Sequence, residues 1–349
     1  MTIKELARQL GVSTATVSRA LSQPELVASE TRSRVLAAAK ACGYQPDAIA
    51  RSLRTGRTQS IGLIVSDITN PFYATVVRAI ENVARPRGYS VIICNADENP
   101  QREEEALALL ASKQVAGIIH ASTGANLAAL EALRARGIPL VDLDRASGLS
   151  GVDAVLVDNA LGARLAVGHL ISLGHRRIAT IAGPQSLTTG RERLDGFLAA
   201  MRSAGLPVPP EFVHTCDFQA ESAELAAAEM LSLPHPPSAL FVANNAMMAG
   251  AFAAIRERGV RVPEDLSTVS FDDVQWAKYI EPPLTVIAQP AEIIGAMAAE
   301  LVFRRIGGEK RPLRRVLDPV LIVRGSTAAP ARAQKPAPLR PAPVTNPLG

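Results

Sequence analysis

A short run near the amino terminus has the side chains needed to recognise a polyanion. Residues 13–19 read Ser-Thr-Ala-Thr-Val-Ser-Arg, so several hydroxyl groups and one guanidinium lie within two helical turns. Guanidinium groups and short hydroxyl side chains can hydrogen-bond a phosphate or a base edge. The chemistry that this run suggests is contact with the major groove of DNA.

Two helices separated by a tight turn must position this run. Thr2 and Glu5 have the spacing of a capping box, and apolar residues then recur at helical spacing over 3–10. Gly11 breaks this helix, and Ser13 can cap the next. We expect a second helix over 14–21.

A third helix completes a small unit. It is expected to begin after Ser29 and to stop at Gly43, with Val35, Leu36 and Ala39 buried. Three short helices can form one compact core and present one helix. This arrangement is typical of a helix-turn-helix whose second helix lies in the major groove.

The distribution of charge agrees with this interpretation. Through Arg57 the chain has nine Lys and Arg against four Asp and Glu, and residues 328–349 add three cations and no acid. The whole chain has a formal net charge of +4, so residues 58–327 carry −4. Positive charge is therefore concentrated at the ends, as expected if the amino-terminal unit meets phosphates.

Length and composition narrow the class of protein. A chain of 349 residues predicts two or three domains, and no apolar run approaches the roughly 20 residues that span a bilayer. The amino-terminal segment does not resemble a signal peptide. Cys42, Cys94 and Cys216 are isolated, as in reduced proteins, so we expect a cytoplasmic protein without a membrane partner.

The rest of the chain alternates short apolar runs with helical segments. Ten candidate strands begin with 61–66 and end with 284–288, and amphipathic helices such as 72–87 and 191–204 lie between them. Apolar strands separated by helices indicate parallel sheets that are covered on both faces. We expect two doubly wound subdomains, with a ligand crevice at the carboxyl ends of the strands.

At this point the chain resembles the lactose/galactose/purine repressor family of bacterial transcription regulators, over residues 1 to about 327. The matching motifs are many and occur in the expected order: Thr2–Ala7, Gly11–Arg19, Gly43–Pro46, Ala50–Gly56, Asp67–Tyr73, Leu173–Ile178, Phe271–Asp273 and Pro282–Thr285. The resemblance implies a multidomain protein with a small all-α helix-turn-helix domain and an α/β body like that of periplasmic binding proteins.

The resemblance implies these boundaries: a helix-turn-helix domain over 1–45, a hinge helix over 46–58 and a body over 59–327. Residues 328–349 lie outside the resemblance, and their Ala/Pro-rich composition without hydrophobic periodicity predicts a disordered tail. Within the body, it implies an N-subdomain of about 59–159 plus 290–318, and a C-subdomain of about 160–289 plus 319–327.

The resemblance also assigns DNA-binding residues. The expected contacts are Ser13, Thr14, Ala15, Thr16, Ser18 and Arg19 in the helix-turn-helix, with Ala50, Arg51, Leu53 and Arg54 in the hinge. Leu53 would act as an apolar wedge in the minor groove, and Arg51 and Arg54 would meet phosphates. Two hinges are needed at one site, so the family implies a homodimer on a pseudo-palindromic operator. Thr16 could equally be a packing residue.

The resemblance also assigns effector-binding residues. The family positions are occupied by Phe72, Tyr73, Thr189, Arg193, Phe218, Asn244, Asn245 and Asp272, and they suit a neutral or weakly acidic, sugar-like ligand. Leu187 stands where purine-binding relatives have an arginine, which argues against a nucleobase. Simpler roles stay open, since Phe72 could belong to the core, Arg193 could pair with an acid and Asp272 could cap a turn.

The expected function is a repressor whose operator affinity changes when a sugar-like effector binds between the two subdomains. Induction by the effector is favoured, and corepression stays open, as does a sugar-binding protein without a regulatory role. No GxGxxG after a strand, GxxxxGK[ST], GxSxG or HExxH motif is present, and the five histidines are scattered. We therefore expect no enzyme, no cofactor and no metal site.

Overall fold

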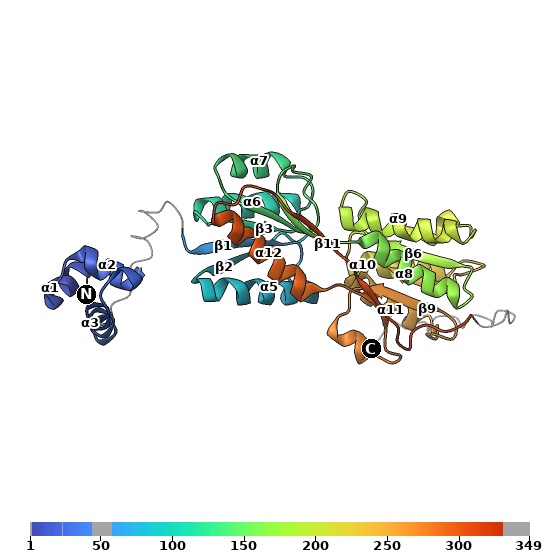
Figure 1. Cartoon of the computed structure of the whole chain (residues 1–349). Coiled ribbons are helices and arrows are strands. Elements are labelled where there is room, and N and C mark those ends of the chain that lie inside the picture. Colours follow the sequence, from blue (N-terminus) through green and yellow to red (C-terminus); the bar gives the residue numbers. More distant parts are fainter. Residues whose placement is uncertain (1, 23, 44–57, 331–349) are drawn as a thin grey trace, which may run out of the picture.

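The computed structural model describes residues 2–22, 24–43 and 58–330. The amino-terminal unit, blue in Figure 1, contains α1 (Ile3–Leu10), α2 (Thr14–Ser22), the short 3-10 helix η1 (Pro24–Leu26) and α3 (Ser29–Ala41). Its core is small and is made of Leu6, Ala7, Val17, Ala20, Val35 and Ala39.

Local signals at α1 are confirmed, and one expected core residue of α3 is wrong. Thr2 and Glu5 form the capping box, and Gly11 ends α1 with a left-handed φ of 68°. Leu36, expected to be buried, is 44% exposed. Val35 and Ala39 lie four residues apart on the buried stripe of α3, and Leu36 is turned about 100° from it.

The body contains two six-stranded sheets. The first has the order β11-β5-β4-β3-β1-β2 and is parallel throughout. We call the unit built on it the N-subdomain. Its strands are β1 (Ser60–Val65), β2 (Ser90–Asn95), β3 (Ile118–His120), β4 (Leu140–Asp144), β5 (Asp153–Val157) and β11 (Arg314–Leu317).

The second sheet has the order β12-β10-β9-β8-β6-β7, and the unit built on it is the C-subdomain. Only its edge strand β12 is antiparallel. Its strands are β6 (Ile178–Ala182), β7 (Val213–Thr215), β8 (Ala239–Val242), β9 (Ser267–Phe271), β10 (Thr285–Ala288) and β12 (Val320–Ile322).

Helices cover both faces of each sheet, as in doubly wound folds. In the N-subdomain α5 (Pro71–Ala84) packs beside α12 (Ala291–Ile306), and α6 (Pro100–Ser112) lies near α7 (Leu127–Ala135). In the C-subdomain α8 (Asn159–Ser172) packs on α9 (Thr188–Ser203), and α10 (Ala220–Leu231) packs on α11 (Asn245–Glu257). Shorter 3-10 segments are η2 (Arg85–Arg87), η3 (Pro210–Phe212) and η4 (Gln275–Lys278). The expected fold class is confirmed.

The ten expected strands are all present, and β11 and β12 were not expected. β11 is an exposed edge strand that begins with two arginines, and β12 has three residues, so neither forms an apolar run. The chain crosses from the N-subdomain to the C-subdomain after β5 and returns after β10. It then adds β11 to the first sheet, crosses once more and adds β12 to the second sheet. Figure 1 shows these crossing segments between the two sheets.

The end of the described chain remains attached to the C-subdomain. The N–H of Ala328 donates to Oγ of Ser267 at 3.0 Å, and its carbonyl oxygen lies 2.9 Å from Nε2 of His175. Residue 328, expected to begin a disordered tail, is therefore held in place. Residues 331–349 and hinge residues 46–57 lie outside the described residues. No helix in the described ranges is long and apolar enough to cross a membrane.

Candidate functional site

Helix α2 presents the expected DNA-reading side chains. Thr14, Ala15 and Arg19 are exposed, whereas Val17 and Ala20 are buried against the other two helices. Because buried and exposed positions alternate at helical spacing, the exposed side chains share one face. This face can approach a duplex without disturbing the core.

The remaining hydroxyl residues of this run have structural contacts of their own. Oγ of Ser13 accepts a hydrogen bond from the N–H of Thr16 at 3.0 Å, and the two side-chain oxygens lie 2.9 Å apart. Ser13 therefore caps α2, and Thr16 supports the cap. Ser18 is partly exposed. The expected hinge contacts lie outside the described residues: Ala50, Arg51, Leu53 and Arg54.

A cavity lies between the carboxyl ends of the two sheets; the space between its atoms, including the part that is open to solvent, is about 410 Å³. Seven of the eight expected effector residues line it: Phe72, Tyr73, Thr189, Arg193, Phe218, Asn244 and Asp272. The sequence analysis missed eight further lining residues, namely Ser66, Asp67, Asn70, Glu98, Asp144, Arg145, Gln219 and Gln289. Ser66, Arg145 and Gln289 follow directly after a strand, which is where a crevice ligand binds in such folds.

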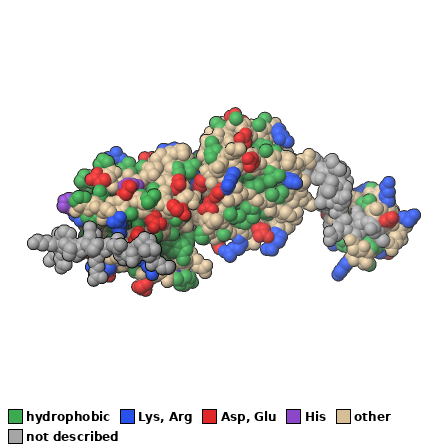
Figure 2. Space-filling view, turned by 180° about the vertical axis from the view of Figure 1, so that it is seen from behind, with side chains coloured by type: hydrophobic (Ala, Val, Ile, Leu, Met, Phe, Trp, Pro, Cys, Tyr) green, Lys and Arg blue, Asp and Glu red, His purple; other side chains and the backbone are tan. Residues whose placement is uncertain are grey.

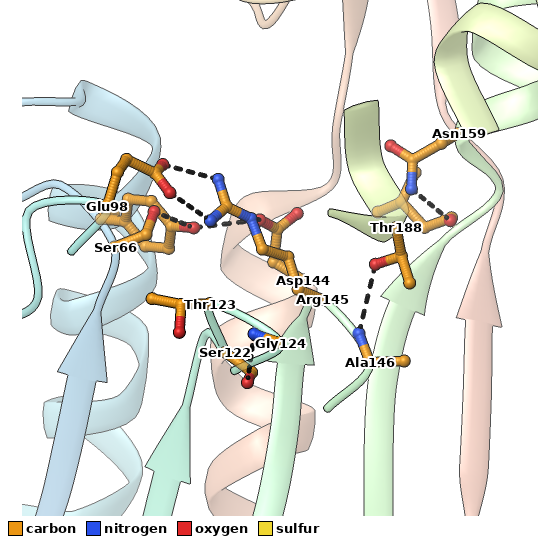
Figure 3. Close-up of polar contacts among 12 residues, drawn as sticks. Ser66, Glu98, Ser122, Thr123, Gly124, Asp144, Arg145, Ala146, Asn159 and Thr188 are labelled. Carbon is orange, nitrogen blue, oxygen red and sulfur yellow. Dashed lines mark hydrogen bonds and ion pairs between the residues drawn. The ribbon is translucent and has the colours of Figure 1, made fainter. Parts of the chain in front are cut away.

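Arg145 follows β4 and forms the main charged contact of the N-subdomain wall. Its Nη1 and Nη2 donate to the two carboxylate oxygens of Glu98 at 2.5 and 2.7 Å. The Arg145 side chain is only 5% exposed. Figure 3 shows this pair beside Ser66 and Asp144. A buried arginine held by a two-pronged contact has a fixed orientation and can offer its remaining donor to a ligand.

Asp144 and Tyr73 extend this network. The Tyr73 hydroxyl donates to Oδ2 of Asp144 at 3.0 Å and accepts from Oγ of Ser66 at 2.9 Å. Burial raises the pKa of Asp144, while Arg145 and Arg193 oppose this rise. Burial also raises the pKa of Tyr73 well above its ordinary value, and the nearby carboxylate of Asp144 adds to this effect. The tyrosine is therefore a hydrogen-bond donor at neutral pH.

Arg193 is the buried arginine of the C-subdomain wall, and its guanidinium is held by neutral groups. Its Nε donates to Oδ1 of Asn159 at 2.8 Å, and its Nη1 donates to the carbonyl oxygen of Ala243 at 2.6 Å. The guanidinium also lies over the ring of Phe271, 3.7 Å from its centre. Burial lowers the pKa of Arg193, and Asp272 opposes this shift. Arg193 does not pair with an acid of its own helix.

Asp272 is held between two amides at the end of β9. Its Oδ2 accepts from Nδ2 of Asn245 at 3.1 Å, and its Oδ1 accepts from Nε2 of Gln289 at 2.6 Å. Asn245 does not line the cavity and instead orients this carboxylate. Asp272 is 5% exposed and makes no capping hydrogen bond among the contacts of the described residues. It is a buried acceptor that faces the cavity.

Several cavity atoms have no hydrogen-bond partner within the described protein. They are Oδ1 of Asp144, Nε of Arg145, Oγ1 of Thr189 and Oε1 of Gln289. Buried polar groups of this kind normally need a partner. Because these donors and acceptors line the same cavity as the rings of Phe72 and Phe218, the cavity suits a ligand with both hydroxyl groups and an apolar face.

The backbone around the cavity is strained. Six described residues other than glycine have a positive φ, and four of them line the cavity: Glu98, Asp144, Phe218 and Asp272. Such conformations each cost about 1–3 kcal/mol and persist where the surrounding structure holds them. Their concentration here indicates that this edge of the fold is shaped for binding.

The walls of the cavity are joined across the two subdomains. Nδ2 of Asn245 donates to Oδ1 of Asn70 at 2.9 Å. The N–H of Ala146 donates to Oγ1 of Thr188 at 3.4 Å, and Figure 3 shows this second contact. Asn70 and Ala146 belong to the N-subdomain side, whereas Thr188 and Asn245 belong to the C-subdomain. A ligand in the cavity would contact both subdomains.

Within the described ranges, no group of three His, Cys, Asp or Glu side chains is arranged to hold a metal ion. The three cysteines are unpaired thiols and are each half-buried.

A helix-turn-helix unit joined to a two-subdomain ligand-binding body defines a class of ligand-responsive DNA-binding regulators. Residues 2–47 match the family described as bacterial regulatory proteins, lacI family, and residues 58–324 match the periplasmic binding proteins and sugar binding domain of the LacI family. This chain belongs to the LacI family. The family consists of regulators, so the expectation that the protein is not an enzyme is confirmed.

Similar proteins span almost the whole chain. The ribose operon repressor of Escherichia coli K12 is 37% identical over 327 residues, covering 93% of this chain and 99% of its own. The transcriptional repressor PurR of Serratia proteamaculans is 39% identical over 331 residues, which cover 94% and 97%.

Solved structures agree in fold. The lac repressor dimer bound to operator and the anti-inducer ONPF has a TM-score of 0.83 and 29% identity, covering 94% of this chain and 99% of its own. A LacI family regulator from Enterococcus faecium with bound ribose has a TM-score of 0.70 and 32% identity, covering 77% and 99%.

Proposed function

We propose that the protein is a cytoplasmic transcriptional repressor that binds a pseudo-palindromic operator as a homodimer and changes its operator affinity when it binds a small neutral sugar. The observation that carries this proposal is the cavity itself. Two buried arginines, Arg145 and Arg193, and two buried carboxylates, Asp144 and Asp272, converge there from opposite subdomains. Donors and acceptors in this number match a ligand that carries several hydroxyl groups.

A monosaccharide is favoured over a purine base. Leu187, at the position where purine-binding relatives have an arginine, is apolar and 7% exposed. Among the relatives, the ribose operon repressor and the ribose-bound regulator point to a pentose. We take ribose as the first probe.

DNA recognition would use the exposed face of α2. Arg19 reads a guanine, Thr14 and Ala15 contact neighbouring base edges, and the amino-terminal hydroxyl residues Ser13, Thr16 and Ser18 meet phosphates. In the hinge, Leu53 would open the central minor groove, with Ala50, Arg51 and Arg54 beside it. The two hinges of a dimer meet there, which requires operator symmetry.

Coupling between ligand and DNA would pass through the relative position of the two subdomains. A sugar that binds both walls favours one relative position of the two subdomains. If operator favours the same position, the sugar strengthens operator binding; if operator favours a different position, the sugar weakens it. Linkage makes this coupling reciprocal, typically about 1–3 kcal/mol. We propose induction, in which the sugar weakens operator binding.

Two assays on the full-length protein test the proposal. In a thermal-shift screen with ribose, other pentoses, hexoses, sugar phosphates and guanine, a neutral monosaccharide should give the largest rise in Tm. Guanine as the strongest ligand would contradict the assignment of the cavity.

The second assay measures which DNA bases Arg19 reads. Arg19→Ala should relax base preference at one position of each half-site by about 1–3 kcal/mol. Equal weakening on all sequences would mean that Arg19 contacts only phosphate.

A further inference from the structure

The edge of the N-subdomain at which β1 begins carries a concentration of positive charge. Because the strands of this sheet are parallel, the helices that precede β2, β3, β4 and β11 end at this edge, namely α5, α6, α7 and α12. We consider the segments that run from the last three helical residues to the following strand, namely 82–89, 110–117, 133–139 and 304–313. They contain nine Lys and Arg and a single acid, Glu309. We call these nine cations the basic rim.

The C-subdomain provides an internal comparison because its sheet has nearly the same topology. The equivalent segments are 170–177, 201–212, 229–238 and 255–266. They contain six Lys and Arg and five Asp and Glu, so their charges nearly cancel. Cations are favoured near helix carboxyl termini by the helix dipole, but this preference applies equally to both subdomains. The excess in the N-subdomain therefore has another cause.

Most of the basic rim is free to meet an external anion. Three members form ion pairs: Arg87 with Glu300, Arg304 with Glu309 and Arg305 with Asp153. The other six are exposed and make no ion pair with another described residue: Arg85, Lys113, Arg134, Arg136, Lys310 and Arg311. Figure 2 shows Lys and Arg side chains at the end of the body where β1 begins in Figure 1. Unpaired surface cations on one edge create a positive potential.

The chain enters the body at this same edge. The N–H of Thr58 donates to the carbonyl oxygen of Gln114 at 3.0 Å, next to Lys113. Between Gly43 and Thr58 the chain has 15 peptide steps, which span at most about 50 Å. The helix-turn-helix unit therefore cannot move far from the basic rim, and DNA bound by that unit stays near the positive edge.

We propose that the basic rim is a second DNA-contacting surface, which binds backbone phosphates of the duplex that the helix-turn-helix units hold. This proposal rests on the proposed DNA-binding function. The contacts are independent of sequence, because Lys and Arg on phosphates carry no base information. These contacts increase the affinity for DNA and its dependence on salt concentration. Whether they form depends on the position of the body relative to the DNA.

The test compares two variants of the full-length protein with the same change in charge. The rim variant carries Lys113→Gln, Arg136→Gln, Lys310→Gln and Arg311→Gln. The matched control carries Arg176→Gln, Arg202→Gln, Arg256→Gln and Arg258→Gln, all exposed in the C-subdomain segments. Operator affinity is measured from 50 to 300 mM KCl on a fragment that extends well beyond the operator, and hydroxyl-radical footprints are recorded.

Each phosphate contact contributes about 0.9 to the slope of log K against log salt. We expect the rim variant to lower this slope by about 2 or more, to lose about tenfold or more in affinity at 50 mM KCl and to lose backbone protection, while the control matches the wild type. Equal slopes for all three proteins, or equal losses in both variants, would overturn the proposal. Failure of the wild type to bind any DNA would instead refute the proposed function.

Discussion

Asn245 and Asn70 join the two subdomains directly, with the Asn245 amide nitrogen 2.9 Å from the Asn70 side-chain oxygen. Asn70 caps α5 in the N-subdomain, and Asn245 begins α11 in the C-subdomain. Asn245 also orients Asp272 in the cavity wall. The Asn245 side chain therefore connects the contact between the subdomains to the ligand site, so we expect its substitution to change ligand binding.

Asn245→Ala should weaken sugar binding without unfolding the protein. The variant loses one hydrogen bond to an amide and one to a carboxylate, together about 1–2 kcal/mol, which corresponds to about 5- to 30-fold in Kd. Titration calorimetry with ribose measures this change. Asn82→Ala, on the exposed end of α5, is the matched control and should bind ribose as the wild type does. An unchanged ribose Kd for Asn245→Ala would show that Asn245 does not support the ligand site.

Arg193→Lys should abolish sugar binding and leave operator binding intact. Lysine keeps the charge but loses the hydrogen bond to Asn159 and the stacking on Phe271. We expect a loss of at least about 100-fold, or about 2.7 kcal/mol. Arg191→Lys is the control, because Arg191 lies two residues earlier on α9 and is exposed. Ribose binding by both variants with wild-type Kd would contradict the assigned role.

The pairing of α10 with α11 depends on a glycine. A Cβ on Gly250 would lie 1.9 Å from the carbonyl oxygen of Ala220, so Gly250→Ala must push the two helices apart. We expect a loss of about 2 kcal/mol or more in the free energy of unfolding. Gly168→Ala on α8 meets nothing within 4 Å and should instead be neutral or stabilise by about 0.5–1 kcal/mol. Thermal denaturation measures both, and similar Tm values would disprove the close approach.

His175 should give the stability a pH dependence. Burial lowers its pKa below the ordinary 6.5, while the carbonyl oxygen of Ala328 partly opposes the shift. The unfolded chain therefore binds a proton that the folded chain does not bind, so stability is lost as pH falls through about 6.5.

Urea denaturation between pH 5 and pH 7 measures this effect. His175→Gln should lose less stability than the wild type on acidification. Burial also lowers the pKa of His169, so part of the slope should remain. His235→Gln, at an exposed position, should behave as the wild type does. An identical pH slope in His175→Gln and the wild type would exclude this histidine as the source.

Sequence alone predicted the fold because the strands are apolar runs with helices between them. The family resemblance predicted cavity residues that follow those runs, such as Phe72 after β1 and Asn244 after β8. The position of a residue after a strand is a local property of the chain, and parallel strands bring such positions to one edge.

The partners of these residues could not be predicted in the same way. Arg145 follows a strand that was expected, but its contact with Glu98 depends on how β2 and β4 lie in the sheet. Asn244 and Asn245 are adjacent identical side chains. The first caps α11 through the N–H of Met247, and the second reaches across to Asn70. Only the orientation of the helix start decides which amide faces the cavity and which bridges the subdomains.

We propose that sugar and operator favour different relative positions of the two subdomains. Fluorescence anisotropy of labelled operator, titrated with the full-length protein with and without saturating ribose, tests it most directly. The account predicts that ribose raises the operator Kd by about 5- to 150-fold, and that operator raises the ribose Kd by the same factor. Ribose that binds the protein and leaves the operator Kd unchanged would contradict it.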